Sequence, residues 1–306
     1  LPESVPGTTI DRQCGSSQQA LHFATQAVMS GTQDIVIAGG VEVMSIVPIG
    51  ASVTDGMNAG HGFPFNAEGI EKRYPGVFFS QFTGAELVAN KWNLSREDLD
   101  QFAFESHLKA AAAANAGFFN KEILPLQGRN DNGNDSMIIA DEGIRFNASF
   151  EALSGLKTVI EGGVITAGNA SQITDGASAI MVCNDDGLKK LKADPRAKIK
   201  TITVVGDDPV FMLTGPIPAS KLALKRADLS IDDMDIYEVN EAFAPVPLAW
   251  AIELGADKSK LNVNGGAIAL GHPLGSTGTK LMTTMLHELE RRNAKYALQA
   301  ICEGGG

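Results

Sequence analysis

Cysteine is scarce in this sequence, which has only Cys14, Cys183 and Cys302 among its 306 residues. The three lie far apart and show no paired spacing, so the sequence predicts neither a disulfide framework nor a zinc or other metal site. Unpaired cysteines are typical of a reducing compartment, and we expect the cytoplasm. Cys183 lies within an apolar run and is predicted to be a core residue.

Long hydrophobic runs are also absent. No apolar stretch approaches the roughly 20 residues that a membrane helix needs, so we expect no membrane span. The sequence begins at Leu1 rather than at methionine. We therefore expect that a preceding segment is missing, together with any targeting signal that it carries.

Basic residues are few: 25 Lys and Arg face 36 Asp and Glu, which gives a net charge of −11. Phosphate backbones are bound by concentrated basic surfaces, so this balance argues against nucleic acid as the main partner. An anionic small ligand would need a local basic pocket. The length and the 44% of hydrophobic residues are sufficient for two packed cores.

Hydrophobic patterns divide the chain into three parts. The first 45 residues predict a strand at 8–13, a helix at 16–29 and a strand at 34–38 that ends in Gly39-Gly40, as in a buried parallel β-α-β unit. Glycine-rich loops and helices follow, the clearest helix being 96–116 with Ser95 as its N-cap. Regular alternation then returns, with predicted strands at 177–183, 198–205, 235–239, 261–264 and 296–302 and helices at 220–227, 247–254 and 279–292. We interpret this as an α/β protein with two cores flanking an insertion.

Cys14 lies in the segment Asp-Arg-Gln-Cys-Gly-Ser-Ser, where a predicted strand turns into a helix. Free backbone N–H groups at the start of a helix favour a thiolate over a thiol, which a nucleophilic cysteine needs. The alternative is an inert buried cysteine, because free cysteine is among the most buried residue types.

His272 lies in a glycine-rich loop, Gly-Gly-Ala-Ile-Ala-Leu-Gly-His-Pro-Leu-Gly, between a predicted strand and a helix. A histidine held between glycine and proline in such a loop can act as a general base and can donate a hydrogen bond to an oxyanion. The alternative is a structural histidine in a turn.

Two further candidates follow predicted strands. Cys302 precedes Glu-Gly-Gly-Gly and could act as a separate acid or base. Asn240 opens Asn-Glu-Ala-Phe at the carboxyl end of a strand, where α/β proteins place their ligands, and could hold a catalytic water. Taken alone, the Asn-Glu pair could equally cap a helix.

In this order, the motifs around Cys14, Asn240, His272 and Cys302 resemble those of the thiolase family, and the stretches 166–177 and 215–220 extend the resemblance. It implies a thiolase fold of two similar α-β-α-β-α halves with an inserted loop domain. The implied domains are an incomplete N-terminal half at 1–43 with 173–195, the loop domain at 44–172 and the C-terminal half at 196–306. By that resemblance, the chain lacks the opening elements of the first half and the last strand of the second.

The resemblance also assigns roles. Cys14 would carry the acyl group, and His272 would be the base that activates Cys14. Cys302 would protonate the departing acetyl-CoA enolate or, in the condensation direction, abstract the alpha proton of acetyl-CoA. Asn240 would fix a water that binds the thioester oxygen with His272, and the N–H groups of Cys14 and Gly304 would form a second oxyanion hole.

Coenzyme A would be a co-substrate rather than a permanently bound cofactor, with acyl-CoA and acetyl-CoA as the other partners. The resemblance places Ala167, Ala170, Ser171, Ala242 and Phe243 along the pantetheine channel. It places Arg145 near the nucleotide end, as the local basic group. Family members are commonly dimers or tetramers, so we expect one of these.

Three features depart from the family pattern. Where the short-chain biosynthetic enzymes have a His-Met pair, the matching stretch here reads Phe79-Ser80-Gln81-Phe82-Thr-Gly-Ala-Glu86, which favours a degradative thiolase for a longer or bulkier acyl group. Ser17 replaces a usual glycine, and Glu303 replaces a common apolar residue. Alternative functions are a ketoacyl synthase-like condensing enzyme and a catalytically silent acyl-CoA- or sterol-binding homologue.

Overall fold

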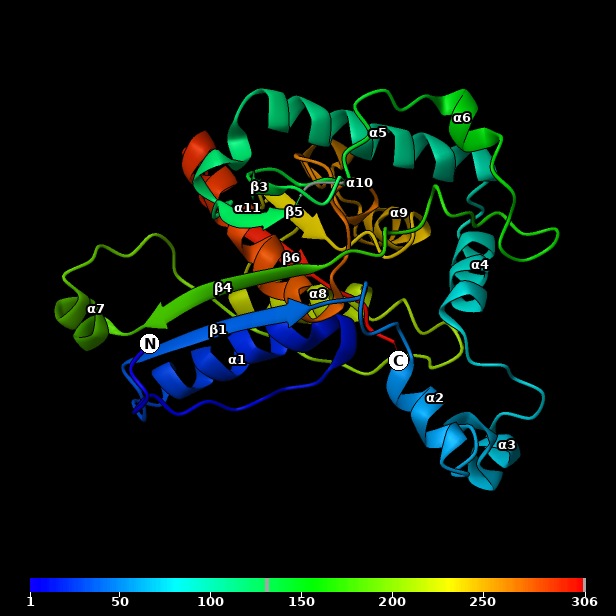
Figure 1. Ribbon diagram of the computed structural model, residues 1–306, viewed down its shortest axis with the longest axis horizontal. Helices are drawn as coiled ribbons and strands as arrows, with labels where there is room; N and C mark the ends of the chain where they lie inside the picture. Colours follow the sequence, from blue (N-terminus) through cyan, green and yellow to red (C-terminus); the bar gives the residue numbers. More distant parts are fainter. Residues whose placement is uncertain (130–131, 305–306) are drawn as a thin grey trace.

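The computed structural model describes residues 1–129 and 132–304 (Figure 1). Its α-helices are α1 Ser16–Met29, α2 Ala51–Asn58, α3 Glu68–Arg73, α4 Gln81–Lys91, α5 Arg96–Asn115, α6 Phe150–Ser154, α7 Asp185–Leu191, α8 Pro216–Ala227, α9 Pro245–Leu254, α10 Ala267–Leu270 and α11 Thr277–Arg292. Its strands are β1 Ile35–Glu42, β2 Leu126–Arg129, β3 Asp135–Ile138, β4 Gly176–Cys183, β5 Ile236–Val239 and β6 Ala297–Ala300. Short 3-10 helices are η1 Gln13–Gly15, η2 Pro64–Asn66, η3 Phe118–Lys121, η4 Lys258–Lys260 and η5 Leu274–Ser276.

The first sheet pairs β1 with β4 in antiparallel fashion, and α1 and α11 pack against it (Figure 1). Side chains of a strand alternate between faces, so Ala38 packs toward Leu21 and Ala24 of α1 while Ile37 and Met181 lie opposite each other on an exposed face. The prediction of a buried parallel strand here was wrong, because the strand that pairs with β1 comes from about 140 residues later and runs the other way.

The glycines that were expected to end β1 lie inside it, since the strand continues to Glu42. A Cβ atom on Gly40 would lie 1.9 Å from the carbonyl oxygen of Gly275 in η5. Only glycine permits so close an approach, which is reinforced by a hydrogen bond of 2.8 Å from Gly275 N to Glu42 Oε2. This contact fixes the end of β1 beside the loop that carries His272.

The second sheet pairs β5 with β6 in parallel, as the alternating pattern predicted. All four residues of β5 are buried, and Tyr237 packs edge-on against Trp250 of α9 with ring centroids 5.2 Å apart. The polar segments that carry Asn240 and Cys302 follow these two strands, so both lie at the same edge of the sheet.

Between the two sheets in the chain, α2 to α6 and the β2–β3 hairpin form the segment that was predicted as an insertion. Helix α5 has the predicted start: Ser95 accepts a hydrogen bond from Asp98 N, and the Asp98 side chain accepts one from Ser95 N. Within the described part of the chain, no helix is long and apolar enough to cross a membrane.

Three predicted strands are absent from the described residues. Residues 8–12 and 198–205 have no regular structure, and 261–264 contribute only isolated bridges, one of them between Leu261 and Tyr237. An extended apolar segment becomes a strand only when a neighbouring backbone pairs with it, and none of the described residues does so along these segments. Cys183 is half-buried at the end of β4 rather than in the core.

Candidate active site

Cys14 lies in η1, immediately before α1, at the chain turn that the sequence predicted. The preceding residue, Gln13, adopts a left-handed backbone conformation with φ +49°. The Cys14 sulfur is buried and receives hydrogen bonds from the backbone N–H groups of Gly304 and of Cys14 itself and from the Gln81 side chain. The two N–H groups that were predicted to form an oxyanion hole therefore converge at this sulfur.

The expected preference of Cys14 for the thiolate is wrong for the free protein. Burial raises the pKa of Cys14 to about 11, and the nearby carboxylate of Glu303 adds to the rise. The three hydrogen bonds lower the pKa but do not offset the loss of water around the sulfur. Cys14 is therefore a thiol at neutral pH and needs a base to become a nucleophile.

His272 follows α10 in a loop that η5 closes, and it is buried. Its Nδ1 lies 2.6 Å from Thr277 Oγ1, which donates its only proton to the carbonyl oxygen of Pro273 at 2.9 Å. The hydroxyl must then accept from His272, so Nδ1 carries the ring proton and Nε2 is the unprotonated, accepting nitrogen. Burial lowers the pKa of His272 to about 3, which leaves the ring neutral and able to accept a proton.

Asn240 follows β5 and is buried beside His272, with Nδ2 of the amide 3.2 Å from Nε2 of the ring. Its Oδ1 has no hydrogen-bond partner within the described protein. A buried amide oxygen of this kind is suited to hold a water molecule.

Glu241 is not a helix cap. It is buried and accepts hydrogen bonds from Ser106 Oγ at 2.7 Å, Asn262 Nδ2 at 2.9 Å and Ile268 N at 3.1 Å. These contacts connect the end of β5 to α5 and to the loop that leads into His272. Glu241 thereby fixes the segment of Asn240 relative to the segment of His272.

Cys302 is buried two residues after β6. Asn240 N donates to the carbonyl oxygen of Ala300 at 3.0 Å, so the segments after β5 and β6 lie side by side. Burial raises the pKa of Cys302 above its ordinary value, and the negative charge of an ionised Cys14 raises it further. The cysteine pair predicted from distant motifs is thus brought together.

The two helical turns next to the catalytic candidates also meet, because η1 packs against η5. Ser17 Oγ accepts a hydrogen bond of 3.1 Å from Thr279 N at the start of α11. The serine that replaces a usual glycine therefore has a partner, and Cys14 lies beside the loop of His272.

The predicted pantetheine residues lie along one strip. Ser171 N donates to the carbonyl oxygen of Ala242 at 3.0 Å, and Ala170 forms a bridge with Phe243. Ala167 is exposed at the start of the strip, and Phe82 of α4 packs edge-on against Phe243 at 5.3 Å between centroids.

Arg145 is exposed and lies near the same strip. Gln172, next to Ser171, donates from Nε2 to the carbonyl oxygen of Gly143 at 2.9 Å, two residues before Arg145. The backbone N–H of Arg145 donates to His107 Nδ1 at 3.2 Å. This places a cation close to the predicted channel, while the arginine side chain remains in solvent.

Sequence reasoning missed three residues of the site. Thr277 determines which nitrogen of His272 is protonated, and it stands in the same motif, five residues later. Gln81 begins α4 in the inserted segment and reaches the nucleophile. Glu241 belongs to the motif Asn-Glu-Ala-Phe, but nothing in the sequence indicated its buried hydrogen bonds. Within the described part of the chain, no group of three or more acidic, His or Cys side chains is arranged to hold a metal ion.

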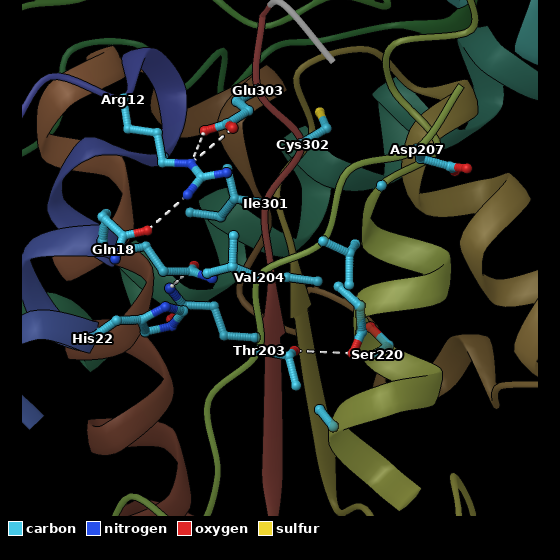
Figure 2. A pocket seen from close by; sticks show the side chains of 18 of the residues that line it. Arg12, Gln18, His22, Thr203, Val204, Asp207, Ser220, Ile301, Cys302 and Glu303 are labelled. Carbon is cyan, nitrogen blue, oxygen red and sulfur yellow. Dashed lines mark hydrogen bonds and ion pairs between the residues drawn. The ribbon is translucent and has the colours of Figure 1, made fainter. Parts of the chain in front are cut away.

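A cavity of about 90 Å³ lies beside residues 298–303, the segment that carries Cys302 (Figure 2). It is bounded by α1, by residues 203–207, by α8 and by residues 298–303. Cys302 borders it, but Cys14 and His272 are not among the described residues that line it. Arg12 and Glu303 form an ion pair at its upper end (Figure 2).

Comparison with known proteins accounts for nearly the whole chain. Residues 1–186 match the model of the thiolase N-terminal domain, and residues 193–306 match that of the thiolase C-terminal domain. The chain belongs to the thiolase family. Its α/β architecture is the thiolase fold, and the protein is an acyltransferase.

Individual thiolases support this assignment. The chain is 51% identical over 306 residues to the steroid 3-ketoacyl-CoA thiolase FadA6 of Mycobacterium tuberculosis, covering 100% of this chain and 74% of the relative. It is 42% identical to a 3-ketoacyl-CoA thiolase of Aliivibrio fischeri, covering 100% of this chain and 78% of the relative.

Solved thiolase structures have the same fold. The crystal structure of human mitochondrial 3-ketoacyl-CoA thiolase superposes with a TM-score of 0.86 at 38% identity, covering 100% of this chain and 77% of that one. A crystal structure of the human enzyme in complex with CoA gives a TM-score of 0.84 at 38% identity, with the same coverage.

Proposed function

We propose that this thiolase cleaves 3-ketoacyl-CoA with coenzyme A and that Cys14 carries the acyl group between the two half-reactions. The convergence of two backbone N–H groups on the buried Cys14 sulfur carries the proposal. Donors in this arrangement stabilise the oxyanion that forms when a sulfur adds to a carbonyl. A neutral His272 whose Nε2 carries no proton supports the choice of base.

In the first half-reaction, the Cys14 sulfur adds to the 3-keto carbon while His272 Nε2 takes the thiol proton. The bond between C2 and C3 then breaks, and its electron pair becomes the enolate of acetyl-CoA. Cys302 donates its proton to C2, acetyl-CoA leaves, and Cys14 holds the acyl group. The unsatisfied Oδ1 of Asn240 supports a water at the enolate oxygen.

In the second half-reaction, the thiol of coenzyme A gives its proton to the Cys302 thiolate and attacks the acyl group. The Cys14 thiolate leaves and recovers its proton from His272, so the free site is restored. The reverse sequence would condense acyl-CoA with acetyl-CoA. Because Cys14 and Cys302 both have raised pKa values, the proton transfers of this second half-reaction return the site to its most stable, uncharged state.

We propose that coenzyme A lies along the strip formed by residues 167–171 and Ala242 and Phe243, with Arg145 near its phosphates. Small side chains and the bridge between Ala170 and Phe243 support a narrow channel for pantetheine. The thiolase structure in complex with CoA gives precedent within the family. We propose that coenzyme A acts there as a co-substrate. The cytoplasmic location and a dimeric or tetrameric state remain predictions.

A bulky or long acyl group is the proposed substrate. The stretch 79–86 lacks the His-Met pair of the short-chain biosynthetic enzymes, and one of the relatives is named as a steroid 3-ketoacyl-CoA thiolase. Thiolysis rates should therefore be compared for acetoacetyl-CoA, a long straight-chain 3-ketoacyl-CoA and one with a ring. A sharp preference for acetoacetyl-CoA would contradict this substrate class.

The activity itself is tested by coenzyme A-dependent loss of 3-ketoacyl-CoA. Cys14→Ala should abolish it, while Cys183→Ala, which removes the half-buried cysteine at the end of β4, should retain it. Persistent thiolysis in Cys14→Ala would refute the acyl-cysteine mechanism. No activity in the unchanged protein would favour a silent acyl-CoA- or sterol-binding homologue.

A further inference from the structure

Arg12 and Glu303 connect the two chain segments that carry the cysteines. Arg12 lies two residues before Cys14, and Glu303 comes directly after Cys302. Arg12 Nε lies 2.8 Å from both carboxylate oxygens of Glu303. Figure 2 shows the carboxylate turned toward the guanidinium, while the Cys302 sulfur lies on the other side of the segment.

The backbone of Arg12 is fixed to the turn that carries the nucleophile. Its carbonyl oxygen accepts from Gly15 N at 3.0 Å, and its N–H donates to Ser16 Oγ at 2.9 Å. The guanidinium also donates from Nη1 to Gln19 Oε1 in α1 at 2.8 Å. A displacement of Arg12 would therefore displace the turn.

Gly15 makes room for this arrangement. A Cβ atom on Gly15 would lie 2.7 Å from Glu303 Oε2, so the carboxylate lies directly against the turn. The glycine after the nucleophile thus has a packing reason in this chain, because any side chain there would push Glu303 away.

The charge of Glu303 acts on both reacting groups. The carboxylate raises the pKa of Cys14 and the pKa of Cys302, because a negative charge disfavours a thiolate nearby. An unpaired carboxylate at this place would oppose each step that forms a thiolate. The cation of Arg12 is paired with this carboxylate, at the position where thiolases commonly have an apolar residue.

We propose that the Arg12–Glu303 ion pair is a positioning device that holds the segments of Cys14 and Cys302 together and neutralises the carboxylate beside them. The inference rests on the proposed function, because Cys14 and Cys302 are the reacting groups of the proposed thiolysis. Its test uses no acyl-CoA, so the ion-pair proposal can fail while the proposed thiolysis holds.

The test is the rate at which iodoacetamide alkylates Cys14 in the full chain, followed by mass spectrometry of the Cys14 peptide at one fixed pH. Arg12→Met leaves Glu303 unpaired and should slow alkylation about tenfold. Glu303→Gln should react at least as fast as the unchanged protein. The double variant Arg12→Met/Glu303→Gln should return to within about threefold of the unchanged rate, because both charges are gone.

Positioning is measured separately with a short reagent that bridges two thiols. The double variant should give a lower yield of the Cys14–Cys302 bridge than the unchanged protein, although its alkylation rate is restored. Arg196→Met is the matched control, since it breaks a similar two-pronged pair, of 2.8 Å and 2.7 Å with Glu290, at the surface. It should change neither rate nor yield.

Two outcomes would overturn the proposal. One is an unchanged alkylation rate in Arg12→Met together with a lowered melting temperature, the result of a purely structural pair. The other is a double variant that reacts as slowly as Arg12→Met or bridges as well as the unchanged protein. If Arg12→Met does not fold, Glu303→Gln keeps the test decisive, because a slower alkylation there would contradict the charge effect.

Discussion

Cys14 and His272 are both buried, but the groups that hydrogen-bond to them come from different distances along the chain. The ring of the base His272 is hydrogen-bonded to Thr277, which lies only five residues away, at the start of the next helix. The nucleophile is held by Gly304 and Gln81, which lie roughly 290 and 67 residues away. One side of the site is therefore built locally, and the other depends on how distant segments assemble.

The difference also appears in the protonation of the two groups. Burial raises the pKa of the thiol and lowers the pKa of the imidazole, so both are uncharged in the free protein. Several hydrogen-bond donors surround the Cys14 sulfur, whereas the His272 ring offers one lone pair, on Nε2. The nucleophile side is organised for a charge that appears during the reaction, and the base side is organised to receive one proton.

Among these variants, removal of the base His272 should lower the rate of thiolysis the most. His272→Ala eliminates the proton acceptor of the Cys14 thiol, and kcat/KM for thiolysis should fall by about a thousandfold. Steady-state kinetics with a 3-ketoacyl-CoA measure it. His61→Ala, at an exposed position of the inserted segment, should leave the rate unchanged. A loss of less than about tenfold would mean that another group accepts the proton.

The pH dependence of Cys14 alkylation in the free protein comes next. With a pKa of about 11, the thiolate fraction rises tenfold per pH unit, so the rate should increase about a hundredfold from about pH 7 to about pH 9 without reaching a plateau. The sign follows from the raised pKa, since lowering the pH below 11 protonates the sulfur. A plateau below about pH 8 would indicate a thiolate paired with an imidazolium.

Thr277→Val tests the local hydrogen bond on the base side. The buried Nδ1–H of His272 loses its acceptor, so the ring can turn or change tautomer. Thiolysis should fall roughly tenfold, equivalent to about 1.4 kcal/mol. Thr283→Val, which removes only a bond of 2.8 Å to a backbone carbonyl in α11, serves as control. Equal rates for the two variants would refute the role of Thr277.

Gln81→Met should have the smallest effect. The thioether matches the size of the amide but cannot donate, so the developing thiolate loses one of its three hydrogen bonds. Alkylation of Cys14 at fixed pH should slow by about fivefold. Gln101→Met, on the exposed surface of α5, is the control. An unchanged rate in Gln81→Met would remove this residue from the nucleophile side.

The same contrast explains what sequence reasoning could predict. His272, Asn240, Cys14 and Cys302 stand in short motifs whose chemistry is readable residue by residue. Helices such as α1 and α5 have local periodicity and capping signals, and their bounds agreed closely with the prediction. These features depend on neighbours within a few positions.

What could not be predicted depends on distant partners. The antiparallel pairing of β1 with β4 joins segments about 140 residues apart, and residues 198–205 have strand-forming side chains without a paired backbone. The pKa of Cys14 was misjudged for a related reason, since burial by remote segments outweighs the local effect of the helix start. Gln81 was missed because nothing in its own neighbourhood points to the nucleophile.

The most direct test of the acyl carrier is mass spectrometry of the intact protein and of its peptides after mixing with 3-ketoacyl-CoA and without free coenzyme A. We predict an adduct with the mass of the acyl group shortened by two carbons, located on Cys14 and released when coenzyme A is added. An adduct on another residue, or cleavage of the substrate without any adduct on Cys14, would contradict the account.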